Sequence, residues 1–153
     1  MKIWNEILSN QVLVSAVAGW IVAQVLKTML DFALNRTINW ERMVGSGGMP
    51  SSHSATVCGL TTAAALHYGV SSFEFAVCFV LSMVVMYDAM GVRRAAGEQA
   101  EAINELREKI SEDQVEEDPF PEWGKPLREA LGHKPTEVIS GAILGIAVSF
   151  LAF

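Results

Sequence analysis

Two histidines carry the chemistry that this sequence predicts, and the first of them is His53. It follows Pro50, Ser51 and Ser52, directly after a glycine-rich stretch and at the start of an apolar segment. A helix that begins there presents hydroxyls and free backbone N–H groups, which hold a phosphate, beside an imidazole that can pass it a proton. The alternative is a flexible loop followed by a helix that one of the serines caps.

The second histidine, His133, precedes Glu137 by four residues. If a helix starts near Pro135, the carboxylate reaches one imidazole nitrogen, fixes the tautomer and makes the other nitrogen a better nucleophile. A lone histidine in a basic loop is more often only a surface residue. We assign His133 a role because the expected topology brings it to the same membrane face as His53.

Four apolar segments predict an all-α integral membrane bundle, with residues 1–153 as a single domain. Hydrophobic residues make up 51% of the chain, and a bilayer crossing needs roughly 20 of them in a row. A soluble bundle would need a polar face that the third segment lacks. We therefore expect about four transmembrane helices, at residues 12–34, 54–69, 73–92 and 138–153.

The connection between the third and fourth segments is a polar insertion at about residues 93–135. Ala96, Ala100, Ile103 and Leu106 recur in it at spacings of three and four, which predicts an amphipathic helix. That helix would rest on the bilayer surface or pack against a second copy of the protein. Prolines then break the pattern, and we expect the chain to return to the membrane as a hairpin.

Charge indicates how the protein lies in the membrane. The net charge is −6, which argues against nucleic acid as a partner. The first connection and the long insertion carry most of the lysines and arginines, and such loops stay in the cytoplasm. We therefore expect a multi-pass plasma membrane protein with both termini outside. One cytoplasmic face then gathers the candidate residues Lys27, Arg36, His53, Arg93, Arg94 and His133.

Two carboxylates accompany these cations. Asp31 lies one turn after Lys27 inside the first segment, and ionisable residues there are candidates for function. Either the two residues pair with each other, or Lys27 faces the same pocket as His53. Asp88 is expected to pair with one of the two arginines that follow it and to orient that arginine.

Three strings in the chain resemble the motifs of the type 2 phosphatidic acid phosphatases, which are related to vanadium haloperoxidases. They are GGMPSSH at 47–53, YDAMGVRR at 87–94 and LGHKPTEV at 131–138. The chain looks like a small, divergent branch of that superfamily. Four features depart from the motifs: no proline follows Arg36, Ser52 replaces a glycine, Glu137 replaces an aspartate, and a long insertion precedes His133.

The resemblance implies a role for each matching residue. His133 is the nucleophile, Glu137 orients it, and His53 donates a proton to the leaving group. The residues that this resemblance assigns to phosphate binding are Lys27, Arg36, Ser51, Ser52 and Arg94, with Arg93 as the alternative to Arg94.

The expected function is a lipid phosphate phosphatase that works at the cytoplasmic leaflet through a phosphohistidine, with no metal or cofactor. Its substrate would be a lipid such as phosphatidylglycerol phosphate or a polyprenyl phosphate. The main alternative is a non-catalytic membrane protein that binds anionic lipid headgroups or scaffolds a complex. A haloperoxidase or a lipid phosphotransferase is a further alternative. Four short helices provide little core, so we expect a homodimer or a higher homo-oligomer.

Overall fold

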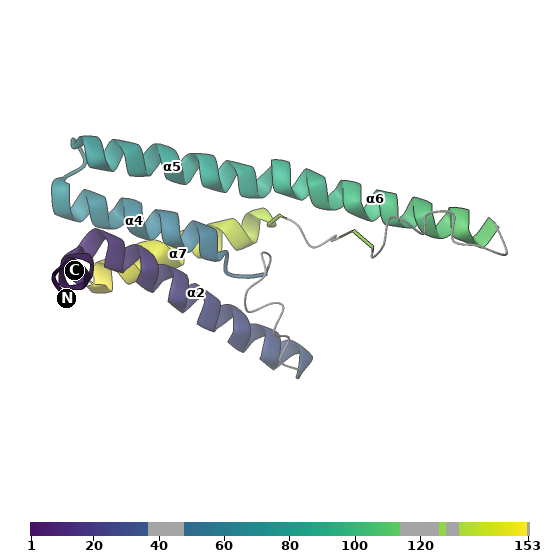
Figure 1. Ribbon diagram of the computed structural model, residues 1–153, viewed down its shortest axis with the longest axis horizontal. Coiled ribbons are helices and arrows are strands. Elements are labelled where there is room, and N and C mark those ends of the chain that lie inside the picture. The colour runs from purple at the N-terminus through teal and green to yellow at the C-terminus, as the bar shows by residue number, and fades with distance from the viewer. Residues whose placement is uncertain (37–47, 114–125, 128–131, 153) are drawn as a thin grey trace.

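The computed structural model describes residues 1–36, 48–113, 126–127 and 132–152. In these ranges the chain forms helices and no strand, which confirms the predicted all-α fold. Residues 45–47 of the glycine-rich stretch, and Pro119 and Pro121 of the return, lie outside the described residues. The helices are α1 (Lys2–Ser9), α2 (Gln11–Asn35), α4 (Ser52–Tyr68), α5 (Phe73–Met90), α6 (Val92–Asp113) and α7 (Pro135–Ala152) (Figure 1).

Three stretches of helix are long and apolar enough to cross a membrane: Gln11–Leu34, Phe73–Ile110 and Pro135–Ala152. They correspond to the first, third and fourth predicted segments. Their outer surfaces expose many large apolar side chains, which marks a membrane-facing surface. The prediction of an integral membrane helical bundle is confirmed.

Helix α4 takes the place of the second predicted segment, and other helices enclose it. It packs against α2, α5 and α7, and most of its buried residues are small. Its 17 residues extend about 26 Å, which is less than the hydrocarbon core of about 30 Å. Because its neighbours face the lipid, α4 needs neither the length nor the hydropathy of an exposed span.

The four packed helices alternate in direction, so their connections gather at two ends of the bundle (Figure 1). Helix α1, the turn between α4 and α5, and the end of α7 lie at one end. The start of α4, the end of α5 and the start of α7 lie at the other. His53, Arg93 and His133 therefore belong to the same end.

Helix α6 continues α5 past the end of the bundle (Figure 1). Gly91 alone separates the two helices, and its N–H still donates to the Tyr87 carbonyl at 2.8 Å, while its carbonyl accepts from the Ala95 N–H at 2.9 Å. The predicted amphipathic helix is present, but its direction does not match the alternative in which it lies flat on the bilayer.

Helix α7 lies against α4 through Gly141 and Gly145. A Cβ atom on Gly141 would overlap the backbone of Ser51, and one on Gly145 would overlap the backbone of Ala55. Small residues at such positions let two helix backbones approach closely inside a membrane. This contact fixes the start of α7 against the start of α4.

We expect Gly145→Val to lower the unfolding temperature of the protein in detergent, because the new side chain must push α7 away from Ala55. Overpacking of this kind costs about 1–3 kcal/mol. Ala147→Val is the matched control, since Ala147 is exposed on the same helix. Equal unfolding temperatures for the two variants would contradict the close contact between α4 and α7.

Candidate active site

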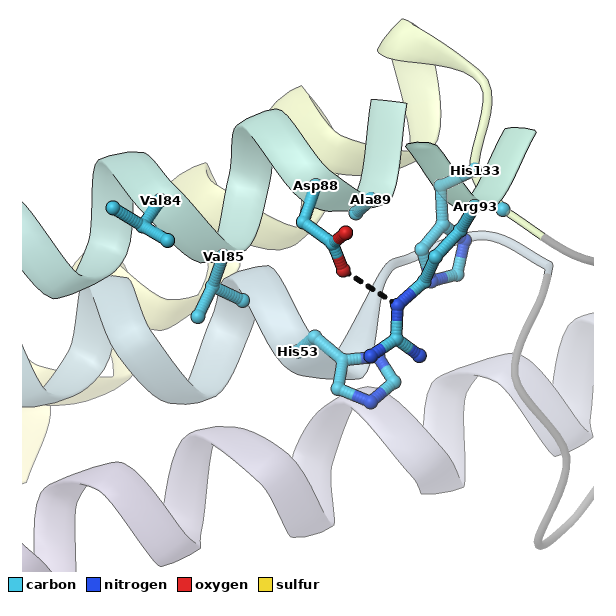
Figure 2. Close-up of a pocket in the computed structure, with 8 residues that line it drawn as sticks. His53, Val84, Val85, Asp88, Ala89, Arg93 and His133 are labelled. Carbon is cyan, nitrogen blue, oxygen red and sulfur yellow. Dashed lines mark hydrogen bonds and ion pairs between the residues drawn. The ribbon is translucent and has the colours of Figure 1, made fainter. Parts of the chain in front are cut away.

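A cavity of roughly 240 Å³ opens at the end of the bundle where α4 and α7 begin. Residues from α4, α5, the start of α6 and the segment before α7 enclose it (Figure 2). Its lining residues are His53, Val84, Val85, Asp88, Ala89, Arg93, Gly132 and His133.

Two hydrogen bonds hold His133, and a third holds the carboxylate of its partner Glu137. Its Nδ1 lies 3.0 Å from Oε2 of Glu137, and the backbone N–H of Lys134 donates to the same oxygen at 3.1 Å. The backbone N–H of His133 donates to the carbonyl of Ala89 on α5 at 3.0 Å. The side chain is only 3% exposed. These contacts fix both the position of the imidazole and the nitrogen that faces the carboxylate.

The other ring nitrogen of His133, Nε2, is buried and has no hydrogen-bond partner among the described residues. In the neutral tautomer that donates from Nδ1 to Glu137, Nε2 carries the lone pair. A buried polar atom without a partner is costly, and a catalytic role is one explanation for it. Nε2 is therefore arranged as a nucleophile or as an acceptor for a ligand.

His53 lies across the cavity from His133, with 6.0 Å between the ring centroids and 57° between the ring planes. A phosphoryl group between the rings would need about 3–3.5 Å from the attacking nitrogen to phosphorus and about 2.6–3.2 Å from the other ring to an oxygen. These two distances together are as long as the present separation of the rings. A phosphoryl group can enter only if the rings move apart. His53 is exposed and His133 is not, so His53 is the ring that can turn.

The environment of His53 also affects its charge. His53 lies one residue before the predicted span, in the first turn of α4. Partial burial of the ring lowers the pKa of His53. The positive charges of Arg93 and Lys27 lower it further, as does His133 when its ring is protonated, while Asp88 acts in the opposite direction. An anion bound in the cavity would raise this pKa, because it favours the protonated ring.

Of the two arginines, Arg93 lines the cavity. Its Nε donates to Oδ2 of Asp88 at 2.7 Å, which leaves the two terminal nitrogens of the guanidinium for another partner (Figure 2). Arg94 instead donates to Glu98 at 2.9 Å and is not among the lining residues. The ion pair with Asp88 thus orients one arginine at the cavity and not the other.

The remaining candidate cations lie outside the cavity lining. Lys27 is buried in α2, with its aliphatic stem beside Gly48, and it interacts electrostatically with Glu137 and His53. Arg36 ends α2 in a left-handed conformation and is exposed. The structure therefore places Lys27 close enough to His53 and Glu137 to act on them electrostatically, and neither Lys27 nor Arg36 lines the cavity.

Ser51 and Ser52 are buried beside His53 and do not line the cavity. Ser51 is the N-cap of α4: its Oγ accepts from the backbone N–H of Ser54 at 3.4 Å. Its own N–H donates to the Glu137 carbonyl at 2.9 Å. These contacts give Ser51 a structural role, while the N-terminus of α4 itself offers backbone N–H groups to an anion.

The long insertion does return to this site. Asn104 on α6 donates from Nδ2 to the carbonyl of Leu127 at 2.9 Å, and its Oδ1 accepts from the Leu127 N–H at 3.0 Å. Gly132 then lies against the backbone of Arg93 and Arg94 with a φ of 85°, where a Cβ atom would not fit. These contacts and the bond to Ala89 bring His133 back to the end of α5.

The Divergent PAP2 family model matches residues 8–148 of the chain. The protein belongs to this family. The uncharacterized membrane protein YuiD of Bacillus subtilis (strain 168) is 42% identical over 151 residues, which cover 95% of this chain and 96% of YuiD. No solved structure matches the chain. The resemblance drawn from the three motifs is confirmed, and so is the membrane location.

Sequence reasoning missed four lining residues of this divergent PAP2 protein: Val84, Val85, Ala89 and Gly132. Gly132 had a visible signal, because it directly precedes His133 in the third motif. Val84 and Val85 precede Asp88 by four and three residues, which puts them on its side of α5. In the sequence they are part of a long apolar run, so nothing separates them from lipid-facing residues.

Proposed function

We propose that this divergent PAP2 protein is a phosphatase of membrane-embedded phosphate esters that works through a phosphohistidine. One observation carries the proposal: the buried Nε2 of His133 has no partner among the described residues, while Glu137 holds the opposite nitrogen. Phosphoryl transfer depends on positioning and charge stabilisation, and both are available around this atom.

In the first step, Nε2 of His133 attacks phosphorus and the P–N bond forms as the bond to the leaving oxygen breaks. His53 gives its proton to that oxygen, which leaves as an alcohol. The guanidinium of Arg93 neutralises charge on the phosphoryl oxygens, and the ammonium of Lys27, outside the cavity lining, adds to the positive potential. Glu137 stabilises the positive charge that develops on the His133 ring.

In the second step, a water molecule attacks phosphorus and the P–N bond breaks. His53, now neutral, takes the proton of the water, as microscopic reversibility requires. Inorganic phosphate leaves, and both histidines return to their starting forms. The mechanism that we propose uses no metal ion and no organic cofactor.

We further propose that the site faces the cytoplasmic leaflet of the plasma membrane. The connections at the cavity end of the bundle hold Arg36, Arg42 and the basic residues of the insertion, and loops rich in lysine and arginine stay inside. A lipid phosphate that is made in the cytoplasmic leaflet would then reach the site without crossing the bilayer.

The experiment that tests this function is phosphate release by the purified protein in detergent with EDTA, across a panel of lipid phosphates. We expect release from at least one lipid. Binding of lipid phosphates without any release would instead support the alternative of a non-catalytic headgroup-binding protein.

The lowered pKa of His53 predicts a particular pH dependence. His53 must be protonated to act as the acid, so the rate falls as the pH rises through its pKa. The profile of kcat/KM reports the free protein and that of kcat reports the complex. Since the bound phosphate raises the pKa of His53, we expect the alkaline limb of kcat at higher pH than that of kcat/KM. Steady-state rates across a pH series measure both limbs, and the opposite order would contradict the role of His53.

A further inference from the structure

The cavity has a polar end and an apolar wall. The polar end consists of His53, Asp88, Arg93 and His133. The wall comes mainly from α5, and its residues are Val84, Val85 and Ala89. The group that is attached to the phosphate of a substrate would lie against this wall.

The apolar wall begins within one helical turn of the reacting groups. Val84 and Val85 precede Asp88 by four and three residues, and one turn of helix rises about 5.4 Å. Figure 2 shows both valines along α5 on the side of Asp88 away from Arg93. Val84 is 60% exposed, so the wall is also part of the outer surface of the bundle.

The apolar surface continues along α5 toward the middle of the bundle. Leu81 and Val77, one and two turns before Val84 and Val85, are exposed too. A hydrocarbon chain attached to the phosphate can therefore leave the cavity along α5 and stay in contact with apolar side chains. The substrate need not leave the bilayer to place its phosphate between the histidines.

A glycerol backbone fits this wall poorly. In a glycerophospholipid, ester and hydroxyl groups separate the phosphate from the acyl chains, and they would lie beside Val84 and Val85. The wall residues Val84, Val85 and Ala89 have no side-chain group that can donate or accept a hydrogen bond. Polar groups that lose water without gaining a partner weaken binding.

We propose, on the basis of the proposed phosphatase function, that the substrate is the phosphate ester of an alcohol that is hydrocarbon from its first carbons. Alkyl and isoprenoid phosphates belong to this class, and glycerophospholipids do not. Val84 is then a specificity-determining residue, because it faces the first carbons of the chain.

A matched pair of substrates tests the proposal. Oleyl phosphate and oleoyl-lysophosphatidate carry chains of the same length, and only the second has glycerol between chain and phosphate. We expect kcat/KM to be about tenfold or more higher for oleyl phosphate. Val84→Thr adds a hydroxyl at nearly constant volume and should reduce this preference, whereas Val25→Thr, at an exposed position on α2, should not. Equal or reversed preference in the unsubstituted protein would overturn the proposal.

A binding measurement separates this proposal from the phosphatase function. A benzoylphenylalanine at position 84 crosslinks to a lipid chain that lies beside it, whether or not the phosphate is released. If neither lipid is hydrolysed, the phosphatase function fails. Stronger crosslinking to oleyl phosphate would then still support the preference for a hydrocarbon chain, and equal crosslinking to both lipids would overturn it.

Discussion

His133→Ala is expected to reduce phosphate release from lipid phosphates by about 10³-fold or more, because it removes the nucleophile of the proposed mechanism. Glu137 contacts the imidazole and the Ala89 carbonyl accepts from the backbone N–H of His133, so the variant keeps the backbone bond to Ala89. Initial rates in detergent with EDTA measure the effect, and the unfolding temperature shows that the variant is folded.

His67→Ala provides the matched control for this variant. His67 is exposed near the end of α4, at the opposite end of the bundle from the cavity, and its loss should leave the rate unchanged. Undiminished phosphate release by folded His133→Ala would contradict the mechanism. An equal loss in both histidine variants would indicate that the effect is not specific to the cavity.

His53→Ala is expected to have the second-largest effect, because general acid catalysis contributes about 10²–10⁴-fold. The size of the loss should depend on the leaving group. An aliphatic alcohol must be protonated as it leaves, whereas p-nitrophenolate leaves without a proton. The rate with a lipid phosphate should therefore fall far more than the rate with p-nitrophenyl phosphate.

The comparison of the two substrates separates proton donation from other roles of His53. If His53 only binds phosphate or supports the start of α4, both rates fall by the same factor. His53→Gln keeps a hydrogen-bond donor but cannot transfer a proton at neutral pH, so it should show the same dependence on the leaving group. An equal loss for both substrates would contradict the assignment of His53 as the acid.

Much of the fold follows from local patterns in the sequence. The three long apolar runs predict membrane-spanning helices, and each is a helix in the structure. The spacing of three and four after Arg94 predicts an amphipathic helix, which is α6. The four-residue spacing of His133 and Glu137 also predicts their contact, since Glu137 lies in the first turn of α7. These features depend on short stretches of chain.

Other features depend on how two helices join or on contacts between distant segments, and the hydrophobic pattern does not determine either. The sequence left open whether Arg93 or Arg94 reaches the site. The continuous helix through Gly91 decides the geometry, because it turns Arg93 toward Asp88 and Arg94 toward Glu98. The return of the insertion likewise needs the fit of Gly132 against α6. The roles of all these residues in catalysis stay predictions.

The most direct test of the mechanism is detection of the phosphohistidine itself. The purified protein would be mixed with a lipid phosphate that it hydrolyses and then quenched in alkali. Phosphohistidine is stable in alkali, whereas phosphorylated aspartate and glutamate are not. The peptides of the protein would then be examined by mass spectrometry. We predict a phosphoryl group on His133, which is absent in His133→Ala and accumulates in His53→Ala when the substrate is p-nitrophenyl phosphate. Phosphate release without any phosphorylated His133, or with the phosphoryl group on another residue, would contradict the mechanism.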